Sequence, residues 1–375
     1  MPLNLALLAA QCIPAHWFSP DPRSLDLLTS TPINCLLVDP PNLTPALITE
    51  AHRRSLKILA PGADATITQD TRDKIHPGSG LIVLSQGVWP GLRTGDDMIA
   101  TPSAAPWVDT NLGYLRYLRS QTQDTIWLAI RPPPGKSFPI RRYQQVMADA
   151  ALAGARWVID IDNTMSTRLL AGDPSAKKDW TILMQTSAFL HSIPDLGHLD
   201  SYSRLGVSVS PTTGALVSGG VLDMLGAQHI PFQIVKNGNG MEQFFDFADD
   251  SIVKFPKTSL GRTMVLPDDV GKLEPVYRRV EVTVGRTNFG LRVFNGAAIL
   301  SAPYSLSSGK SVGVLLVNYT DYVAENITLH VQGTWKKATL ESPGQPPKPL
   351  SIYSVKTATA IEIDALDTIA FIRVE

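Results

Sequence analysis

Short apolar runs recur along the first two thirds of the chain, and most of them end at a polar residue and precede a stretch long enough to form a helix. Continuous apolar runs that alternate with helices are typical of a parallel sheet covered on its faces by helices. The helical patterns cover residues 45–55, 141–154, 180–191 and 215–226. The predicted strands, about eight in number, cover residues 33–38, 57–60, 81–84, 126–130, 157–161, 206–209, 232–235 and 251–255.

The pattern changes near Lys257, where helical spacing stops and short, partly alternating runs are separated by Gly, Pro, Ser and Asp clusters. Regular short strands with turn residues between them predict an antiparallel β-sandwich. The predicted strands cover residues 277–284, 289–294, 297–300, 312–319, 326–331, 335–341, 352–355, 360–363 and 368–374.

Together the two patterns predict an α/β fold in which a (β/α)8 TIM-type barrel, residues 1–258, precedes a C-terminal antiparallel β-sandwich, residues 259–375. In such a barrel the chemistry lies where the strands end. The C-terminal domain is predicted to be an accessory domain with a structural role, because its aromatic residues mostly fall inside strand patterns, where core packing is the default.

Composition and charge exclude several classes of partner. The chain has 375 residues, of which 44% are hydrophobic and 18% charged, and its formal net charge is -1. The lysines and arginines are scattered, so neither nucleic acid nor a membrane surface is an expected partner. No apolar segment approaches the ~18 residues that span a bilayer. The sequence leaves the oligomeric state open.

The N-terminus and the two cysteines bear on the compartment. Residues 3–10 are apolar and end in small residues, as the tail of a secretory signal would, but no positive region precedes them. Two interpretations stay open: an exported protein beginning near Gln11, or a cytoplasmic protein whose first strand or loop packs under the barrel. Cys35 falls inside a predicted strand, where a thiol is usually an inert small hydrophobe. With Cys12 it predicts neither a disulfide framework nor a metal site.

Aromatic and polar residues lie close to predicted strand ends. Trp89 comes shortly after Gln86, and Trp107 precedes Asp109 and Asn111 in one short segment. Sugars offer C–H faces that stack on tryptophan and hydroxyls that pair with Asp and Asn, so these residues would suit a carbohydrate-binding cleft.

The segment around Trp107 has a second interpretation. Residues 112–118 have helical spacing, so Trp107 and Val108 would staple the start of a helix for which Asp109 or Thr110 is the N-cap.

A βα barrel followed by a compact β-sandwich resembles the architecture of many glycoside hydrolases, and the resemblance implies a carbohydrate as substrate or ligand. The resemblance covers most of the chain but is architectural. The large barrel group with one glutamate after strand 4 and another after strand 7 is not matched. Only Glu50 and Glu242 are glutamates before Pro256, and the corresponding strands end in Arg131 and Lys236.

Aspartates are the remaining candidates for acid–base chemistry. Asp160 and Asp162 are two residues apart, so on a strand both would point to the same face. Two close carboxylates raise one pKa, as a general acid requires, and Asp39 follows the first predicted strand. With Asp39 they could also hold a divalent cation, but no metal or cofactor is predicted.

Each aspartate also has a structural interpretation. Asp162 would cap the next helix, Asp160 would form an ion pair with Arg131, and Asp39 would form a turn before proline.

The cations at strand ends complete the candidate site. Arg131 and Lys236 would neutralise the aspartates or bind an anionic group of the substrate. Asn237 belongs to a polar, glycine-rich loop expected at the rim, and His16 is the histidine expected near it.

Three functions follow from these residues: a glycoside hydrolase-like enzyme using aspartates, a catalytically degenerate carbohydrate-binding relative, or a barrel lyase or aldolase that would need Lys236 as its reactive amine.

Overall fold

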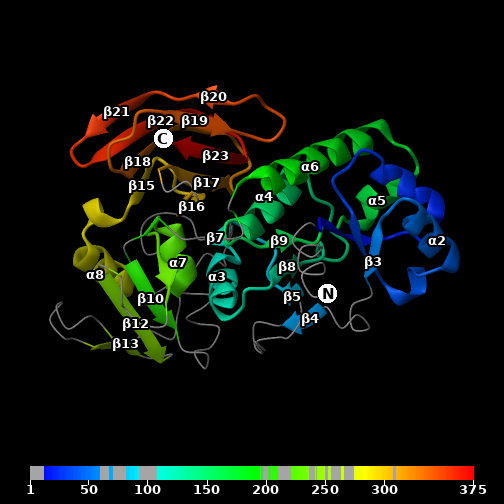
Figure 1. The fold of residues 1–375 in the computed structure, drawn as a ribbon, viewed down its shortest axis with the longest axis horizontal. Helices are drawn as coiled ribbons and strands as arrows, with labels where there is room; N and C mark the ends of the chain where they lie inside the picture. The colour runs from blue at the N-terminus through cyan, green and yellow to red at the C-terminus, as the bar shows by residue number, and fades with distance from the viewer. Residues whose placement is uncertain are drawn as a thin grey trace. The chain divides into compact units, whose positions relative to one another are not determined.

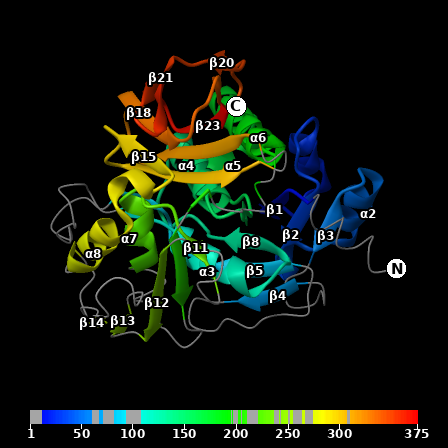
Figure 2. The ribbon, with the colours of Figure 1, turned by 60° about the vertical axis from the view of Figure 1, so that its left-hand side comes forward.

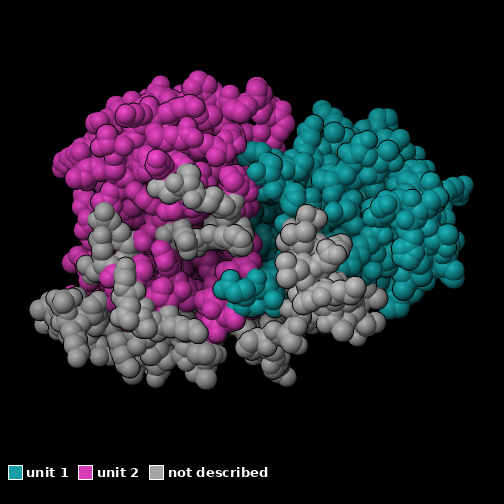
Figure 3. Space-filling model, viewed as in Figure 1, with its two compact units in different colours: residues 1–89, 122–151, 155–192 teal, residues 90–121, 152–154, 193–375 magenta. Residues whose placement is uncertain are grey.

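The computed structural model describes residues 12–59, 67–70, 82–92, 108–194, 196, 202–203, 205–209, 221–235, 241, 243–249, 252–254, 263–265, 274–306 and 310–375. The chain divides into two compact units (Figure 3). Unit 1 comprises residues 1–89, 122–151 and 155–192, and unit 2 comprises residues 90–121, 152–154 and 193–375. The predicted boundary between residues 258 and 259 lies outside the described residues and stays a prediction.

Unit 1 alternates short strands with helices (Figure 1). Its helices start where the sequence supplies caps: Thr44 accepts from the Leu47 amide at the start of α2, and Asp162 accepts from the Met165 amide at the start of α5. The elements are β1 Pro14–Trp17, η1 Pro22–Leu28, β2 Cys35–Val38, η2 Pro40–Asn42, α2 Pro45–Arg53, β3 Lys57–Leu59, β4 Ile67–Asp70, β5 Ile82–Gln86, β8 Thr125–Ala129, α4 Ile140–Ala151, β9 Arg156–Trp157, α5 Asn163–Leu170 and α6 Pro174–Ser192.

The strands of unit 1 form two parallel sheets, β1-β2-β3 and β4-β5-β8-β9 (Figure 2). A parallel bridge between Ala15 and Ile159, just beyond β9, joins them. The bridge carries two hydrogen bonds, from the His16 amide to the Ile159 carbonyl and from the Ile159 amide to the Pro14 carbonyl. Because all these strands are parallel, their carboxyl ends gather at one edge.

The mixed α/β content is confirmed, but the sheets are not closed into a barrel. No pairing joins β3 to β4 among the described residues, and β9 has only two residues. The runs predicted at 206–209, 232–235 and 251–255 correspond to β10 (Leu205–Val209), β11 (Gln233–Ile234) and β13 (Ile252–Lys254). These three strands belong to one sheet of unit 2. Apolar runs identify buried strands but carry no information on which strand each will pair with, so the eight-stranded barrel is not confirmed.

The first part of unit 2 contains several helices and a five-stranded sheet of order β11-β10-β12-β13-β14. The pairs of β10 with β11 and β12 are parallel, and the remaining pairs are antiparallel. Its first elements are β6 Gly91–Leu92, β7 Val108–Asp109, α3 Leu112–Gln121, β10 Leu205–Val209, α7 Leu222–Ala227, β11 Gln233–Ile234, β12 Gln243–Asp249, β13 Ile252–Lys254, β14 Thr263–Val265, α8 Glu274–Val284 and η5 Arg286–Asn288.

The prediction of a strand at residues 277–284 was wrong, because this segment belongs to helix α8. Its many β-branched residues suggested a strand, but the buried apolar side chains are Val276, Tyr277, Val280 and Val284. Spacings of three, four and eight residues place them on one face of a helix, so packing overrode the local strand propensity.

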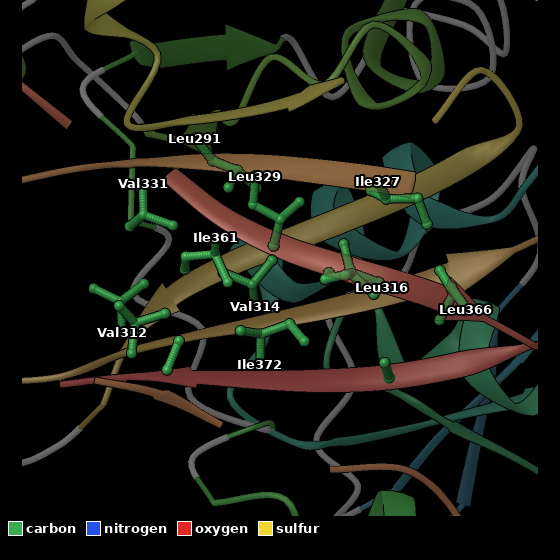
Figure 4. Close-up of a cluster of buried hydrophobic side chains, with 14 of the residues drawn as sticks. Leu291, Val312, Val314, Leu316, Ile327, Leu329, Val331, Ile361, Leu366 and Ile372 are labelled. Carbon is green, nitrogen blue, oxygen red and sulfur yellow. The ribbon is translucent and has the colours of Figure 1, made fainter. Parts of the chain in front are cut away.

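The rest of unit 2 forms two antiparallel sheets, β15-β18-β22-β21 and β16-β17-β23-β19-β20. Side chains from both sheets share one apolar core, in which Leu329 and Ile361 of the first lie with Val314 and Ile372 of the second (Figure 4). The strands are β15 Leu291–Phe294, β16 Ile299–Ser305, β17 Val312–Asn318, β18 Ala324–Gln332, β19 Ala338–Glu341, β20 Lys348–Pro349, β21 Ile352–Val355, β22 Ala358–Leu366 and β23 Ile369–Val374.

The two cysteines are joined in a disulfide, which corrects the expectation of an inert thiol. Cys12 and Cys35 are both 1% exposed, and their Cα atoms are 5.6 Å apart. The bond ties the segment before β1 to the start of β2. The parallel pairing of β1 with β2 places these residues together, although 23 positions separate them in the sequence. The N-terminal segment at residues 3–10 lies outside the described residues.

Candidate active site

Four polar side chains of unit 1 meet at the carboxyl ends of its parallel strands. His16 lies on β1, Asp39 follows β2, Arg131 lies two residues beyond β8, and Asp160 follows the bridging residue Ile159. The alignment of parallel strands puts these ends side by side. The structure thus brings together three residues predicted for the site and the histidine expected near its rim.

Arg131 and His16 both contact the two carboxyl groups. Arg131 Nη2 is 3.0 Å from Asp39 Oδ2, and Arg131 Nε is 3.7 Å from Asp160 Oδ2. On the other side, His16 Nε2 is 3.2 Å from Asp39 Oδ1, and His16 Nδ1 is 3.5 Å from Asp160 Oδ2. The Asp160 side chain is only 11% exposed, whereas that of Asp39 is 41% exposed. The ion pair proposed between Asp160 and Arg131 is therefore present as a contact.

The two carboxyl groups of this cluster have opposite pKa shifts. Burial raises the pKa of Asp160 to about 6, and the nearby charges of His16 and Arg131 only partly offset it. Burial acts to raise the pKa of Asp39 as well, but hydrogen bonds from His16 and Arg131 outweigh it and hold that pKa below its usual value. Near pH 5 the cluster therefore has one protonated and one ionised carboxyl group.

His16 connects the two carboxyl groups through its two ring nitrogens. Its Nε2 also lies 2.7 Å from Arg131 Nη2, which can only donate. A hydrogen on Nε2 allows donation to Asp39, whereas an unprotonated Nε2 accepts from Arg131, so these contacts belong to different protonation states of the ring.

Asp162 lies in a different environment from Asp160. The strand stops at Trp157, so the prediction that both carboxylates share one strand face was wrong. Asp162 instead is the N-cap of α5, where its Oδ1 accepts from the Met165 amide at 2.9 Å. Its Oδ2 accepts from the Tyr143 hydroxyl at 2.5 Å, and that hydroxyl accepts from the Asp162 amide at 3.1 Å. These contacts match the capping interpretation.

The bond between Tyr143 and Asp162 is expected to stabilise the segment that carries Asp160. Tyr143→Phe leaves the buried Asp162 carboxylate without this donor, so we expect a loss of about 1–3 kcal/mol in the free energy of unfolding. Tyr117→Phe is the matched control, because Tyr117 is also buried on a helix but its hydroxyl makes no hydrogen bond in the described part of the chain. Denaturant unfolding measures both; equal effects of the two variants would contradict the assignment.

Four aromatic rings lie together beside this segment. Trp89 stacks on Phe138 at a centroid distance of 4.8 Å, and Tyr143 stacks on Trp157 at 6.1 Å. Trp89 meets Tyr143 edge-on at 5.8 Å, which joins the two pairs. Trp89 and Phe138 are half-buried, so each keeps part of its ring surface exposed. The group links Asp162, through Tyr143, to a partly exposed aromatic surface.

Three other predicted site residues that the structure describes, Gln86, Asp109 and Asn111, are not in this cluster. Gln86 is an exposed residue at the end of β5 in unit 1. Asp109 and Asn111 belong to unit 2, where Asn111 is buried and Thr110 Oγ1 accepts from the Leu112 amide at the start of α3. Because α3 begins at Leu112, Asn111 occupies the N-cap position, not Asp109 or Thr110, although the Thr110 hydroxyl still accepts from the first helical amide. Predictions for three residues fall outside the described part of the chain: Trp107, Lys236 and Asn237.

Sequence reasoning underrated His16 and missed Tyr143 and Phe138. Strand β1 has only four residues and includes a proline and the polar His16, so it gave no apolar run. The side-by-side residues His16 and Trp17 just before a turn were the available signal. Tyr143 lies on the apolar face of α4, so the sequence predicts an ordinary core residue. Only its contact with Asp162 distinguishes it from the other buried residues of this helix.

Comparisons with known proteins show similarity in fold but not in sequence. No protein-family model matches the chain, and no curated protein is similar to it in sequence. Among solved structures, the alpha-L-fucosidase isoenzyme 2 from Paenibacillus thiaminolyticus has a TM-score of 0.58 at 10% identity, covering 97% of this chain and 99% of that chain. A rhamnosidase from Novosphingobium sp. PP1Y has a TM-score of 0.45 at 11% identity, covering 88% of this chain and 38% of that chain.

The fucosidase comparison supports the architectural resemblance to glycoside hydrolases. In the parts of the chain that the structure describes, no group of three or more His, Cys, Asp or Glu side chains is arranged to hold a metal ion. None of the described helices is both long and apolar enough to cross a membrane.

Proposed function

We propose that unit 1 is the catalytic unit of a glycoside hydrolase-like enzyme, in which Asp160 is the general acid and Asp39 is the ionised partner. The observation that carries the proposal is the opposite shift of their two pKa values within one cluster at the strand ends. Glycosidases need one protonated and one ionised carboxyl group across the scissile bond, and environments that push two pKa values apart assign these roles.

The separation of the two groups suits this chemistry. Both carboxylates contact the single guanidinium group of Arg131, at 3.0 Å for Asp39 Oδ2 and 3.7 Å for Asp160 Oδ2, so the pair is held within the span of one side chain. Glycosidase carboxyl pairs lie about 5 to 10 Å apart. Arg131 and His16 orient the pair and keep Asp39 ionised. Asp162 is then a positioning residue, which holds the segment after Asp160 through Tyr143 and the cap of α5.

A carbohydrate is the substrate class that fits the rest of the cluster's surroundings. The partly exposed rings of Trp89 and Phe138 offer flat apolar surfaces of the kind on which sugar C–H faces stack. One solved structure with a similar fold is named an alpha-L-fucosidase, so α-L-fucosides belong in the first substrate panel. Gln86, at the end of β5, completes the proposed binding site in unit 1. The assignment of Lys236 and Asn237 to substrate binding stays a prediction.

The finer architecture and the compartment belong to the same proposal. The parallel sheets of unit 1 would be part of a (β/α)8-type arrangement, and the two antiparallel sheets of unit 2 a sandwich. The disulfide between Cys12 and Cys35 supports an exported protein, because such bonds persist in oxidising compartments.

The pH dependence of turnover tests the assignment. Asp160 must be protonated to donate, so kcat/KM is expected to fall tenfold per pH unit as the pH rises above about 6. Asp39 must be ionised, and its lowered pKa keeps activity high down to acidic pH. The measurement uses natural glycosides with unactivated leaving groups. A profile that stays flat from pH 5 to about 8 would exclude Asp160 as the acid.

Two other functions remain to be separated from this one. A catalytically degenerate carbohydrate-binding protein would bind glycans from the same panel without turnover. A barrel lyase or aldolase would be trapped through Lys236 by borohydride with a carbonyl substrate, and an unmodified Lys236 would remove that alternative.

A further inference from the structure

Unit 2 contains a pocket of its own, with a volume of about 720 Å³. Three segments enclose it: the end of α7 at residues 227–229, the turn between β15 and β16 at residues 295–298, and the loop from β17 into β18 at residues 318–325. Leu92 completes the wall. The volume lies in the range of small-molecule sites, about 300–1,000 Å³. None of the residues assigned above to catalysis lines this pocket.

The lining disfavours anions. Among the described residues, no lysine or arginine lines the pocket, and Glu325 is the single carboxylate that does. Burial lowers the pKa of His229 to about 4, so this ring is neutral at physiological pH. A phosphate or carboxylate ligand would meet the Glu325 charge with no cation to balance it. Hydrogen-bonding groups of Gln228 and Asn295 line the same space as the apolar side chains of Val293 and Ile299.

An exposed aromatic ring lies at the mouth of the pocket. The Tyr322 side chain belongs to a residue that is 68% exposed, and its neighbour Val323 is 43% exposed. Tyr322 and Val323 therefore present apolar surface to solvent where they line the pocket. A tyrosine ring presents a flat face for stacking together with a polar end.

Hydrogen bonds of the buried Asn318 side chain hold the loop that carries Tyr322 in place. Buried Asn318 donates from Nδ2 to the carbonyls of Tyr322, at 2.8 Å, and Asp367, at 2.8 Å. Its Oδ1 accepts from both the amide and the hydroxyl of Thr320, at 3.0 and 2.7 Å. A ligand would therefore meet an aromatic surface whose backbone is already fixed, which lowers the entropic cost of binding.

The wall of the pocket formed by residues 227–229 is held in place by His229. This residue follows α7 with φ of 54°, a conformation that glycine adopts more readily. Its Nε2 lies 3.1 Å from the Gly296 carbonyl, so the side chain ties the end of α7 to the turn between β15 and β16. Glycine at position 229 would relieve the backbone but lose this connection between two walls of the pocket.

We propose that this pocket is a second carbohydrate-binding site, which takes a neutral sugar with one face stacked on Tyr322 and its hydroxyls bonded to Glu325, Gln228 and Asn295. Neutral sugars combine an apolar C–H face with many hydroxyls, which matches described lining residues that include Val293 and Ile299, the polar side chains of Gln228 and Asn295, and the carboxylate of Glu325, with no lysine or arginine among them. The site needs residues 227–229 as well as the C-terminal sheets. A fragment starting near residue 262 would therefore lack one wall.

Hydrogen–deuterium exchange of the full chain tests the proposal, because it locates binding along the sequence. The probes are L-fucose, L-rhamnose, D-galactose and D-xylose. Each is used at about 50 mM, so that a complex with a dissociation constant of roughly a millimolar is populated. D-glucuronate is the anionic counterpart. We expect at least one neutral sugar to slow exchange in residues 318–326, and glucuronate to have no effect there. Protection by none of the neutral sugars, or equal protection by glucuronate, would overturn the proposal.

Matched variants sharpen the test. Tyr322→Ala is expected to lower the apparent affinity for the sugar, as measured by this protection, at least tenfold. Glu325→Gln is expected to lower the same affinity several-fold. Tyr353→Ala is the control, because Tyr353 is an exposed tyrosine of unit 2, 47% exposed on β21, that does not line the pocket. Asp160→Asn should keep the protection even where it removes turnover, so failure of the catalytic proposal would leave this one standing. Loss of protection in Tyr353→Ala would count against the site.

Discussion

Asp160→Asn is expected to lower turnover of unactivated glycosides by several orders of magnitude and, at the same time, to stabilise the protein above pH 6. Asparagine keeps the shape of the side chain but cannot donate a proton to the leaving group. It also removes a carboxylate that burial makes costly to ionise. Activity and stability thus change in opposite directions, as expected for a residue kept for chemistry at some cost in stability.

The size and pH range of the stability effect follow from proton linkage. The folded pKa of Asp160 is about 6, above the unfolded value of about 3.9, so the folded state binds the proton more tightly. Ionising this group therefore costs stability as the pH rises from about 4 to 6, by about 3 kcal/mol in total. The variant should exceed the wild type by roughly that amount at pH 7 and match it below about pH 4. Thermal and denaturant unfolding across this range measure it.

Asp39→Asn is the matched control with the opposite sign. The folded pKa of Asp39 is lowered, so its carboxylate stabilises the protein above the unfolded pKa, and this contribution is lost as the pH falls through the folded value. The asparagine variant should therefore be less stable at neutral pH. Destabilisation by Asp160→Asn at pH 7 would instead support a purely structural ion pair with Arg131.

Leaving-group dependence separates the two catalytic roles. An activated aryl leaving group departs with little help from an acid, so Asp160→Asn should lose far less activity on 4-nitrophenyl glycosides than on natural ones. Asp39→Asn should lose activity on both, because the ionised partner acts whatever the leaving group. Equal losses on both substrates in Asp160→Asn would remove this residue from the role of general acid.

Loss of the disulfide is the second large effect expected. The bond closes a loop with a sequence separation of 23, and its removal is expected to cost about 3 kcal/mol of unfolding free energy through the entropy of the unfolded chain. It also joins the segment before β1 to β2, the strands that position His16 and Asp39. We therefore expect turnover to fall along with stability in the double variant Cys12→Ala, Cys35→Ala.

Reduction of the wild type provides the control for this variant. Wild type unfolded in the presence of reductant should lose the same free energy as the double variant, and reductant should have no effect on the double variant. Alkylation followed by mass spectrometry counts free thiols in the native protein. Two alkylated cysteines in unreduced wild type, or a melting temperature that reductant does not change, would contradict the expectation.

The sequence determined where most buried strands and helices of the chain lie. Every apolar run predicted between residues 33 and 255 overlaps a strand, although the run at 157–161 does so only at Trp157, and α2, α4 and α6 fall where helical spacing predicts them. Burial explains this success, because a strand covered on both faces needs consecutive apolar residues and a half-buried helix needs them every three or four. Local composition misled where packing opposed it, as in α8, and it gave no signal for the short or polar strands β1, β4 and β12.

The tertiary structure decided how the strands pair and which carboxylate has which environment. Asp160 and Asp162 look equivalent in the sequence, but the end of β9 at Trp157 turns one toward His16 and Arg131 and the other into the cap of α5. His16 joined the site because β1 pairs with β2 and bridges to Ile159. Spacing along a chain fixes periodicity, whereas pairing between strands and the desolvation that raises the pKa of Asp160 are set by residues distant in sequence.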